Sequence, residues 1–248
     1  MQCWAACLGD CGDVASQEHV ISKCLYPDQA ITVQGFPWCR DAPKDVRIEK
    51  LTQQILCKRH NEQLGTDVDW ASKHSIETLG RAFELLIVRQ KLRSRRWTVQ
   101  YFETDMLLLE RWCLKTLINT NHQGGLKYTD GSEPDSPPAE LVEFVFGKRR
   151  FTDHKGLYMI ADSGSQITLT EGWLRITAKS QNERLVGGKF MLWGVPFYLS
   201  LLPTQVTWDS ATLMRHGMRH WFQTIDDRGL NVKSHLVTFT YPPPVPPI

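Results

Sequence analysis

The sequence lacks long apolar runs, a strong charge of one sign and any internal repeat. Its longest apolar stretches, such as residues 106–109, are far shorter than the roughly 20 residues of a membrane-spanning helix. Residues 1–15 contain no basic segment followed by an apolar one, so we expect no secretory signal and a cytoplasmic location. A formal net charge of +2 and a pI near 8.1 neither require nor oppose a nucleic-acid partner.

The composition is that of an ordinary globular protein that changes character near residue 70. Hydrophobic residues make up 42% of the 248 positions and charged residues 23%, enough to bury a normal core. Residues 1–70 are rich in cysteine and turn-forming residues, whereas later residues show regular periodicity. We therefore predict an α+β protein with a small domain over 1–70 and an α+β domain over 71–248.

The second part is predicted to begin with helices and continue with strands. Apolar residues recur at helical spacing from about residue 70 to residue 95. Thr104 or Asp105 can cap another helix, with Trp112, Lys115 and Asn119 along one side. Beyond residue 151, short apolar segments alternate with turn residues. This pattern predicts a largely antiparallel sheet or a partial barrel.

The cysteines indicate a metal site, because thiols stay reduced in the cytoplasm and five of the seven lie before residue 40. Cys57 and His60 have the spacing of a zinc knuckle. Three cysteines, Cys3, Cys7 and Cys11, compete to supply the other two ligands. We favour Cys3 with Cys7, because a knuckle-like glycine follows Cys7 at a distance of two residues. Cys7 with Cys11 is the alternative.

Two further segments contain residues suited to phosphodiester hydrolysis. Glu18 and His19 supply a carboxylate and an imidazole side by side, and Asn61 follows the second zinc pair directly. A neutral imidazole can take a proton from water, because its pKa lies near the working pH. A magnesium ion takes oxygen ligands, often only one or two of them from the protein. Zinc would then staple the two segments together.

These segments resemble the HNH endonuclease superfamily, the ββα-metal nucleases. The run from Glu18, Glu-His-Val-Ile-Ser-Lys, is similar to the family's acid-His-Val/Ile-Ile-Pro-Lys run. The run from residue 56, Leu-Cys-Lys-Arg-His-Asn, is similar to its Leu-Cys-x-x-Cys-Asn run. The resemblance covers about residues 3–69. It implies that His19 is the general base, that Glu18 and Asn61 bind a catalytic Mg²⁺ or Mn²⁺, and that a structural Zn²⁺ is bound by Cys3, Cys7, Cys57 and His60, with Cys11 as the alternative ligand.

The chain departs from the family pattern at four positions. Ser22 replaces the usual proline, His60 replaces a cysteine ligand, and Glu18 is longer by one methylene than the commoner aspartate. The middle asparagine of the family would fall near Thr52 or Gln53.

The expected substrate is nucleic acid, double-stranded DNA rather than RNA, and analogy with free-standing HNH proteins suggests defence against foreign DNA. A basic run follows the nuclease-like part, and we expect it to contact phosphates: Arg89, Lys91, Arg93, Arg95 and Arg96. The alternative to an enzyme is a non-catalytic, zinc-stapled nucleic-acid-binding module. A protein partner or a homodimer is compatible with either function.

Overall fold

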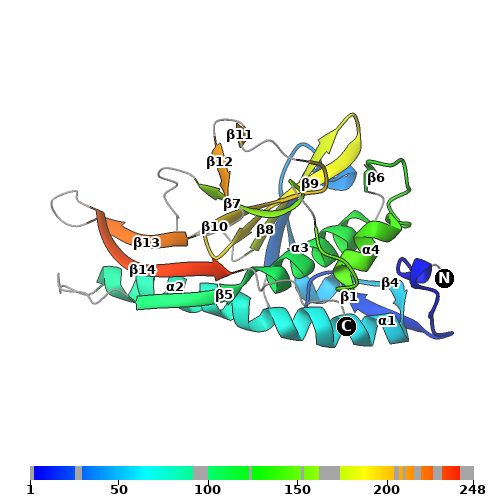
Figure 1. Ribbon diagram of the computed structural model, residues 1–248, viewed down its shortest axis with the longest axis horizontal. Helices are drawn as coiled ribbons and strands as arrows, with labels where there is room; N and C mark the ends of the chain where they lie inside the picture. Colours follow the sequence, from blue (N-terminus) through cyan, green and yellow to red (C-terminus); the bar gives the residue numbers. More distant parts are fainter. Residues whose placement is uncertain are drawn as a thin grey trace.

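The computed structural model describes most of the chain. The described residues are 3–25, 30–91, 100–122, 125–151, 154–161, 174–203, 207–208, 211–214, 219–225 and 231–240. Within these ranges the protein is mixed α+β, and most of its strand pairings are antiparallel (Figure 1). The predicted fold class is therefore confirmed.

The cysteine-rich part forms a two-stranded hairpin followed by a helix. Strand β1 (Ala15–His19) pairs antiparallel with β4 (Thr52–Cys57), and α1 (Lys58–Leu64) begins directly after β4. The π-helical turn η4 (Gly65–Trp70) and helix α2 (Ala71–Lys91) continue the same helical run. A short 3-10 turn, η1 (Ala6–Leu8), lies before β1.

The largest sheet has nine strands and includes part of the loop between β1 and β4. Its order is β11-β12-β7-β10-β9-β8-β2-β3, with β6 pairing β9 from the side. Its strands are β2 (Ala30–Gln34), β3 (Lys44–Arg47), β6 (Lys127–Tyr128), β7 (Gly156–Ala161), β8 (Leu174–Gln181), β9 (Arg184–Leu192), β10 (Val195–Ser200), β11 (Thr207–Trp208) and β12 (Ala211–Met214). The loop segment joins through a parallel pairing of β2 with β8.

A smaller sheet of three strands lies beside α2. Strand β14 (Asn231–Thr240) pairs antiparallel with β13 (Arg219–Ile225) and parallel with β5 (Gln100–Asp105). The remaining short elements are the 3-10 turns η2 (Pro37–Cys39) and η3 (Ile48–Lys50) and the helix α4 (Ala139–Val145).

Helix α3 (Met106–Asn121) lies at the centre of the molecule. Figure 1 shows it between the nine-stranded sheet and the run formed by α1, η4 and α2. Asp105 caps it as predicted, because its Oδ1 accepts from the backbone amides of Leu107 (2.8 Å) and Leu108 (3.2 Å). Most of α3 is buried on all sides, including polar residues such as Lys115 and Asn119. Buried polar side chains require hydrogen-bond partners, and those of Lys115 and Asn119 lie on the hairpin and η4.

The predicted boundary near residue 70 does not separate two cores. Strands β2 and β3, which precede it, belong to the same sheet as β7 to β10, which follow it. A single hydrophobic cluster extends from Cys3 to Leu201. The close approach of the segment after β2 to strand β8 requires a glycine, because a Cβ at Gly35 would meet the backbone carbonyl of Ala178. Residues 1–70 are thus packed into the rest of the chain.

Among the described residues, no helix has both the length and the apolar character needed to cross a bilayer.

Candidate functional site

Four side chains converge at the base of the hairpin in the geometry of a zinc site. The ligand atoms of Cys3, Cys11, Cys57 and His60 all lie within 4.8 Å of one another. The Nδ1 atom of His60 lies 3.4 Å from Cys3 Sγ, 3.7 Å from Cys11 Sγ and 3.3 Å from Cys57 Sγ. Tetrahedral zinc, with bonds of about 2.3 Å to sulfur and 2.0 Å to nitrogen, would place these atoms about 3.6 Å apart. The donor set and the spacing therefore both fit a zinc ion.

The structure groups Cys11, rather than Cys7, with Cys3, Cys57 and His60. Cys7 lies in the η1 turn and is exposed, outside the four-residue group. Gly9 follows this turn with φ of 80°, a left-handed conformation that glycine adopts without strain. The chain reverses there, and Cys11 comes back towards Cys3. The first two ligands are therefore eight residues apart, a separation that short-motif reasoning does not recognise.

A carboxylate outside the ligand set orients the histidine ligand. His60 Nε2 donates to Asp10 Oδ1 at 2.8 Å, which leaves Nδ1 free to face the three sulfurs. The hydrogen bond from His60 is the main influence that lowers the pKa of Asp10, and the charges of Arg59 and Lys148 add to it. Such carboxylate–histidine pairs set the tautomer of metal-binding imidazoles. Asp10 was not among the predicted site residues, although its position beside Cys11 was a usable signal.

The thiols differ in how readily they ionise. Burial raises the pKa of Cys3, whereas Cys57 has a lowered pKa. Burial opposes ionisation of Cys57 too, but hydrogen bonds from the backbone of His60 and Gly12 and from the neighbouring thiols outweigh it. A bound metal would favour the thiolate form of all three cysteines.

The hairpin places the Glu18–His19 pair opposite the first two residues of β4. Glu18 is paired with Gln53 and His19 with Thr52. The register shifts between Ser16 and Glu18, because one residue of β1, Gln17, lies opposite two residues of β4, Gln54 and Ile55, as in a β-bulge. Glu18 is buried and His19 is half-buried, so the two side chains differ in their access to solvent.

Helix α1 brings Asn61 to the strand that carries this pair. Asn61 Nδ2 donates to Ser16 Oγ at 2.7 Å and to the backbone carbonyl of Gln17 at 3.1 Å. With both donors of the amide turned towards β1, its Oδ1 remains an acceptor. The predicted site residues Glu18, His19 and Asn61 therefore come from adjoining segments of the hairpin and helix.

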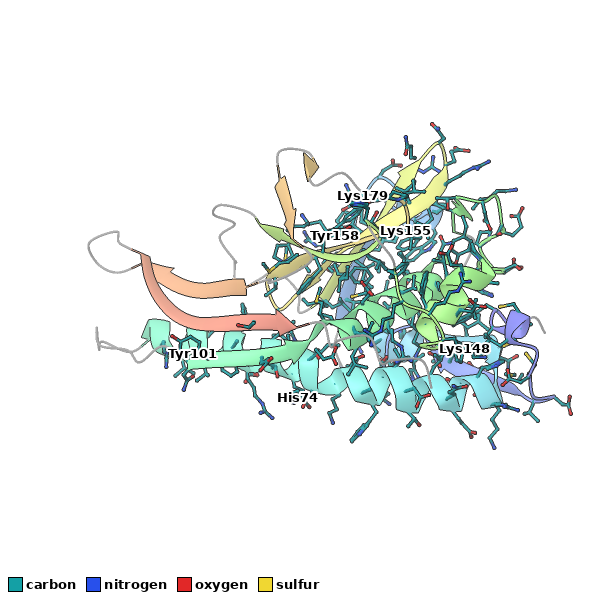
Figure 2. The ribbon with its side chains drawn as sticks, in the orientation of Figure 1. His74, Tyr101, Lys148, Lys155, Tyr158 and Lys179 are labelled. Carbon is teal, nitrogen blue, oxygen red and sulfur yellow. The ribbon has the colours of Figure 1, made fainter. Side chains whose placement is uncertain are left out.

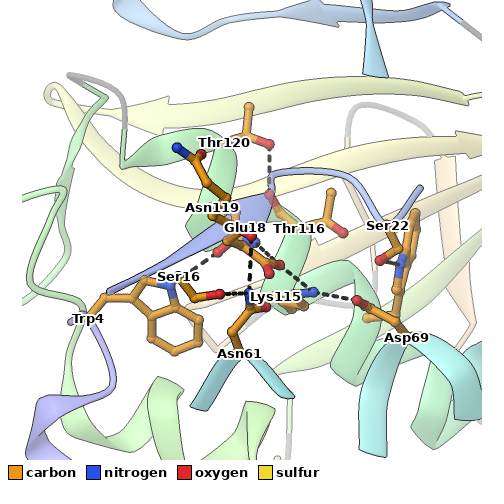
Figure 3. Close-up of polar contacts among 12 residues, drawn as sticks. Trp4, Ser16, Glu18, Ser22, Asn61, Asp69, Lys115, Thr116, Asn119 and Thr120 are labelled. Carbon is orange, nitrogen blue, oxygen red and sulfur yellow. Dashed lines mark hydrogen bonds and ion pairs between the residues drawn. The ribbon is translucent and has the colours of Figure 1, made fainter. Parts of the chain in front are cut away.

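The carboxylate of Glu18 is held by two side chains of α3 (Figure 3). Lys115 Nζ lies 2.6 Å from Glu18 Oε1, and Asn119 Nδ2 donates to the same oxygen at 3.2 Å. Lys115 also lies 2.6 Å from Asp69 Oδ2, so one ammonium is shared between two carboxylates. Lys115 and Asn119 were predicted to share one helix face, but no sequence pattern indicated their contact with Glu18.

Burial and these partners determine the charges in the site. Burial alone would lower the pKa of Lys115, but Glu18 and Asp69 raise it, so the group remains an ammonium. Burial raises the pKa of Glu18, and the ammonium counteracts this effect. Burial also lowers the pKa of His19, with smaller contributions from Lys23 and Lys115 in the same direction and from Asp69 in the other. His19 is therefore neutral at neutral pH.

Only part of the predicted basic run can be placed. Arg93, Arg95 and Arg96 lie outside the described residues, and Lys91 is described only as the last backbone position of α2. Arg89 lies on α2, about 27 Å beyond Ala71 at 1.5 Å per residue, so this run extends away from the hairpin. Lys148 is exposed, and its charge lowers the pKa of Asp10. Lys148 therefore lies at the end of the molecule that carries the cysteine and histidine cluster (Figure 2).

Comparison of the chain with protein-family models, curated proteins and solved structures gives no match.

Proposed function

We propose that this protein is a metal-dependent endonuclease of the HNH type that hydrolyses phosphodiester bonds in DNA. The observation that carries the proposal is the contact between α1 and β1. Asn61 forms hydrogen bonds with Ser16 and Gln17, which directly precede Glu18 and His19. The three cysteines and His60 lie together where the same hairpin meets the helix. The paired strands β1 and β4 and the helix α1 that follows β4 resemble the arrangement of a ββα-metal nuclease, with the acid, the base and the amide on neighbouring segments.

In this proposal His19 is the general base. Its imidazole is neutral at neutral pH because burial disfavours the charged form, and it is half-exposed, so a water molecule can reach it. Lys23 and Lys115 add positive potential nearby, which further disfavours protonation of the ring. The proton taken from the attacking water would go to the imidazole and then to solvent.

The oxygens of Glu18 and Asn61 suit a hard divalent cation such as Mg²⁺ or Mn²⁺. Lys115 and Asn119 both bind Oε1 of Glu18, and among the described residues no hydrogen bond reaches its Oε2. Asn61 likewise keeps its Oδ1 as an acceptor. A bound cation would neutralise charge on the phosphate and stabilise the leaving 3′ oxygen. Two protein ligands are typical for Mg²⁺, which retains several waters.

The structural zinc of this proposal is bound by Cys3, Cys11, Cys57 and His60. It joins the segment before β1 to the start of α1, and so holds the two halves of the active site together. The exposed Lys148 lies near this end and adds a candidate phosphate contact to the basic run that begins at Arg89.

The test is nicking of supercoiled plasmid by the purified, zinc-loaded chain. We expect cleavage with Mg²⁺ or Mn²⁺, none with EDTA, and a rate reduced at least about 100-fold in His19→Ala, in line with general-base contributions. The control is His74→Ala, because His74 is an exposed histidine on α2. Circular dichroism verifies that both variants fold. Unchanged nicking by His19→Ala would refute the role of this histidine.

A second function is favoured by the ion pair of Glu18 with Lys115. An internal ammonium already neutralises this carboxylate, as expected if the hairpin is only a scaffold for binding nucleic acid. A gel shift run beside the plasmid assay separates the two functions. Binding without cleavage across several divalent metals would establish the non-catalytic module and exclude the nuclease.

A further inference from the structure

One face of α3 forms hydrogen bonds and an ion pair with residues on both sides of His19, namely Glu18 and Ser22. Three buried residues at spacings of three and four share this face. Trp112 Nε1 donates to Ser22 Oγ at 3.1 Å, while Lys115 and Asn119 bind Glu18. Asn119 in turn accepts a hydrogen bond from Trp4, the neighbour of a cysteine ligand, at 3.1 Å. Glu18 is thus held from a helix about 100 residues later in the chain.

The ammonium of Lys115 occupies a cation position between two carboxylates. It lies 2.6 Å from Glu18 Oε1 and 2.6 Å from Asp69 Oδ2, and its side chain is only 1% exposed. Asp69 belongs to the π-helical turn η4, and such turns are frequent at functional sites. The other oxygen of Asp69, Oδ1, is buried without a hydrogen-bond partner among the described residues. Without Lys115, two carboxylates would face one small, buried space.

A divalent cation would fit the same position. Bonds of about 2.0–2.2 Å between Mg²⁺ or Mn²⁺ and carboxylate oxygens are only slightly shorter than the ion-pair distances of Lys115. A cation bound there would occupy the oxygen of Glu18 that faces Asp69. The cation would then lie on the α3 side of Glu18, away from Oε2, the oxygen that the proposed reaction needs.

We propose that Lys115 is a positioning residue that excludes divalent cations from the space between Glu18 and Asp69. It thereby leaves Oε2 of Glu18 as the one oxygen available to a catalytic ion. This inference rests on the proposed function for its effect on cleavage, whereas the exclusion itself is independent of that function. Removing the ammonium creates a buried site with two carboxylate ligands, so cation binding and turnover should change in opposite directions.

The experiment compares Lys115→Met with the unmodified chain, both loaded with one equivalent of zinc. Methionine preserves the aliphatic stem and removes the charged atom. Mn²⁺ affinity is measured without DNA from the electron paramagnetic resonance signal of free Mn²⁺, and plasmid nicking is measured separately. We expect Mn²⁺ affinity to rise about tenfold or more, because the cation gains a second carboxylate and loses a repelling ammonium. We expect nicking to fall at least about tenfold.

Two companion variants control for charge and folding. In Asp69→Asn, Lys115 still occupies the space, so Mn²⁺ affinity should stay within about threefold of the unmodified chain. In the double variant Lys115→Met with Asp69→Asn, the space has one carboxylate, and the gain in affinity should be smaller than in Lys115→Met alone. The double variant also removes one buried negative charge together with the positive one, so it folds more readily than Lys115→Met alone.

Each outcome decides the inference. Unchanged or weaker Mn²⁺ binding by folded Lys115→Met would overturn the exclusion. If Lys115→Met does not fold, wild-type nicking by the folded double variant would overturn the positioning role, and impaired nicking would support it. If the unmodified chain cleaves no DNA, the nuclease proposal fails, while a gain of Mn²⁺ binding in Lys115→Met would still establish Lys115 as the excluding cation.

Discussion

Replacing Cys11 by serine tests the metal site most sharply, because Cys7 offers a matched control four residues away. Both cysteines are exposed, so neither substitution removes a side chain from the core. Cys3 and Cys57 are buried, and their replacement would confound loss of zinc with loss of packing. Any difference between Cys11→Ser and Cys7→Ser therefore reports on ligation.

The expected size of the effect follows from the number of ligands. Four-ligand structural zinc sites contribute about 10–16 kcal/mol of apparent binding free energy at neutral pH, so one ligand accounts for roughly 3–4 kcal/mol. At about 1.4 kcal/mol per factor of ten, loss of one ligand weakens zinc binding by about 100-fold or more. The same free energy is lost from the stability of the zinc-bound protein, because the unfolded chain has no assembled site.

The assay measures zinc per chain after dialysis against a chelator, together with the midpoint of urea unfolding. We expect about one zinc per chain for the unmodified protein and for Cys7→Ser, and much less for Cys11→Ser. Cys11→Ser should also unfold at lower urea. Equal loss of zinc in the two variants, or full zinc and normal stability in Cys11→Ser, would refute the ligand set read from the structure.

Two further predictions concern acid stability and salt dependence. Burial lowers the pKa of His122, so the stability from its neutral ring is complete above the unfolded value of about 6.5 and is lost as the pH falls through the lower folded value. His122→Gln should therefore lose less free energy of unfolding between about pH 7 and pH 5 in urea titrations, and an equal loss would contradict this. Lys148→Gln should reduce the slope of log affinity for duplex DNA against log salt by about one, and the triple change of Arg93, Arg95 and Arg96 to Gln by up to about three. An unchanged slope in the triple variant would confine the duplex to the end of the molecule near Lys148.

Local features of the fold were predictable because near neighbours decide them. Asp105 caps α3 through amides two and three residues away, and Cys57 and His60 lie one turn apart, within a single strand-to-helix junction. The strands beyond residue 151 were recognisable from short apolar segments between turn residues, and the antiparallel character of the sheet followed from them.

The choice of Cys11 over Cys7 could not be made from spacing. It depends on the tertiary arrangement: Cys7 is exposed on η1, whereas Cys11, which follows the left-handed residue Gly9, lies beside Cys3, Cys57 and His60. The sheet that joins residues on the two sides of position 70 could not be predicted for a related reason. The pairing of β2 with β8 joins segments that lie more than 140 residues apart, and no local pattern encodes such a pairing.

The sequence by itself determined the kinds of side chain present and the short runs that bring Glu18 to His19 and Cys57 to His60. Only the tertiary structure decided that Lys115 and Asn119 hold Glu18 and that Asp69 shares the same ammonium. A buried lysine must have an opposite charge beside it, since an unpaired ammonium is strongly disfavoured in a protein interior. That rule requires a partner for Lys115, but the identity of the partner depends on how α3, η4 and β1 pack together.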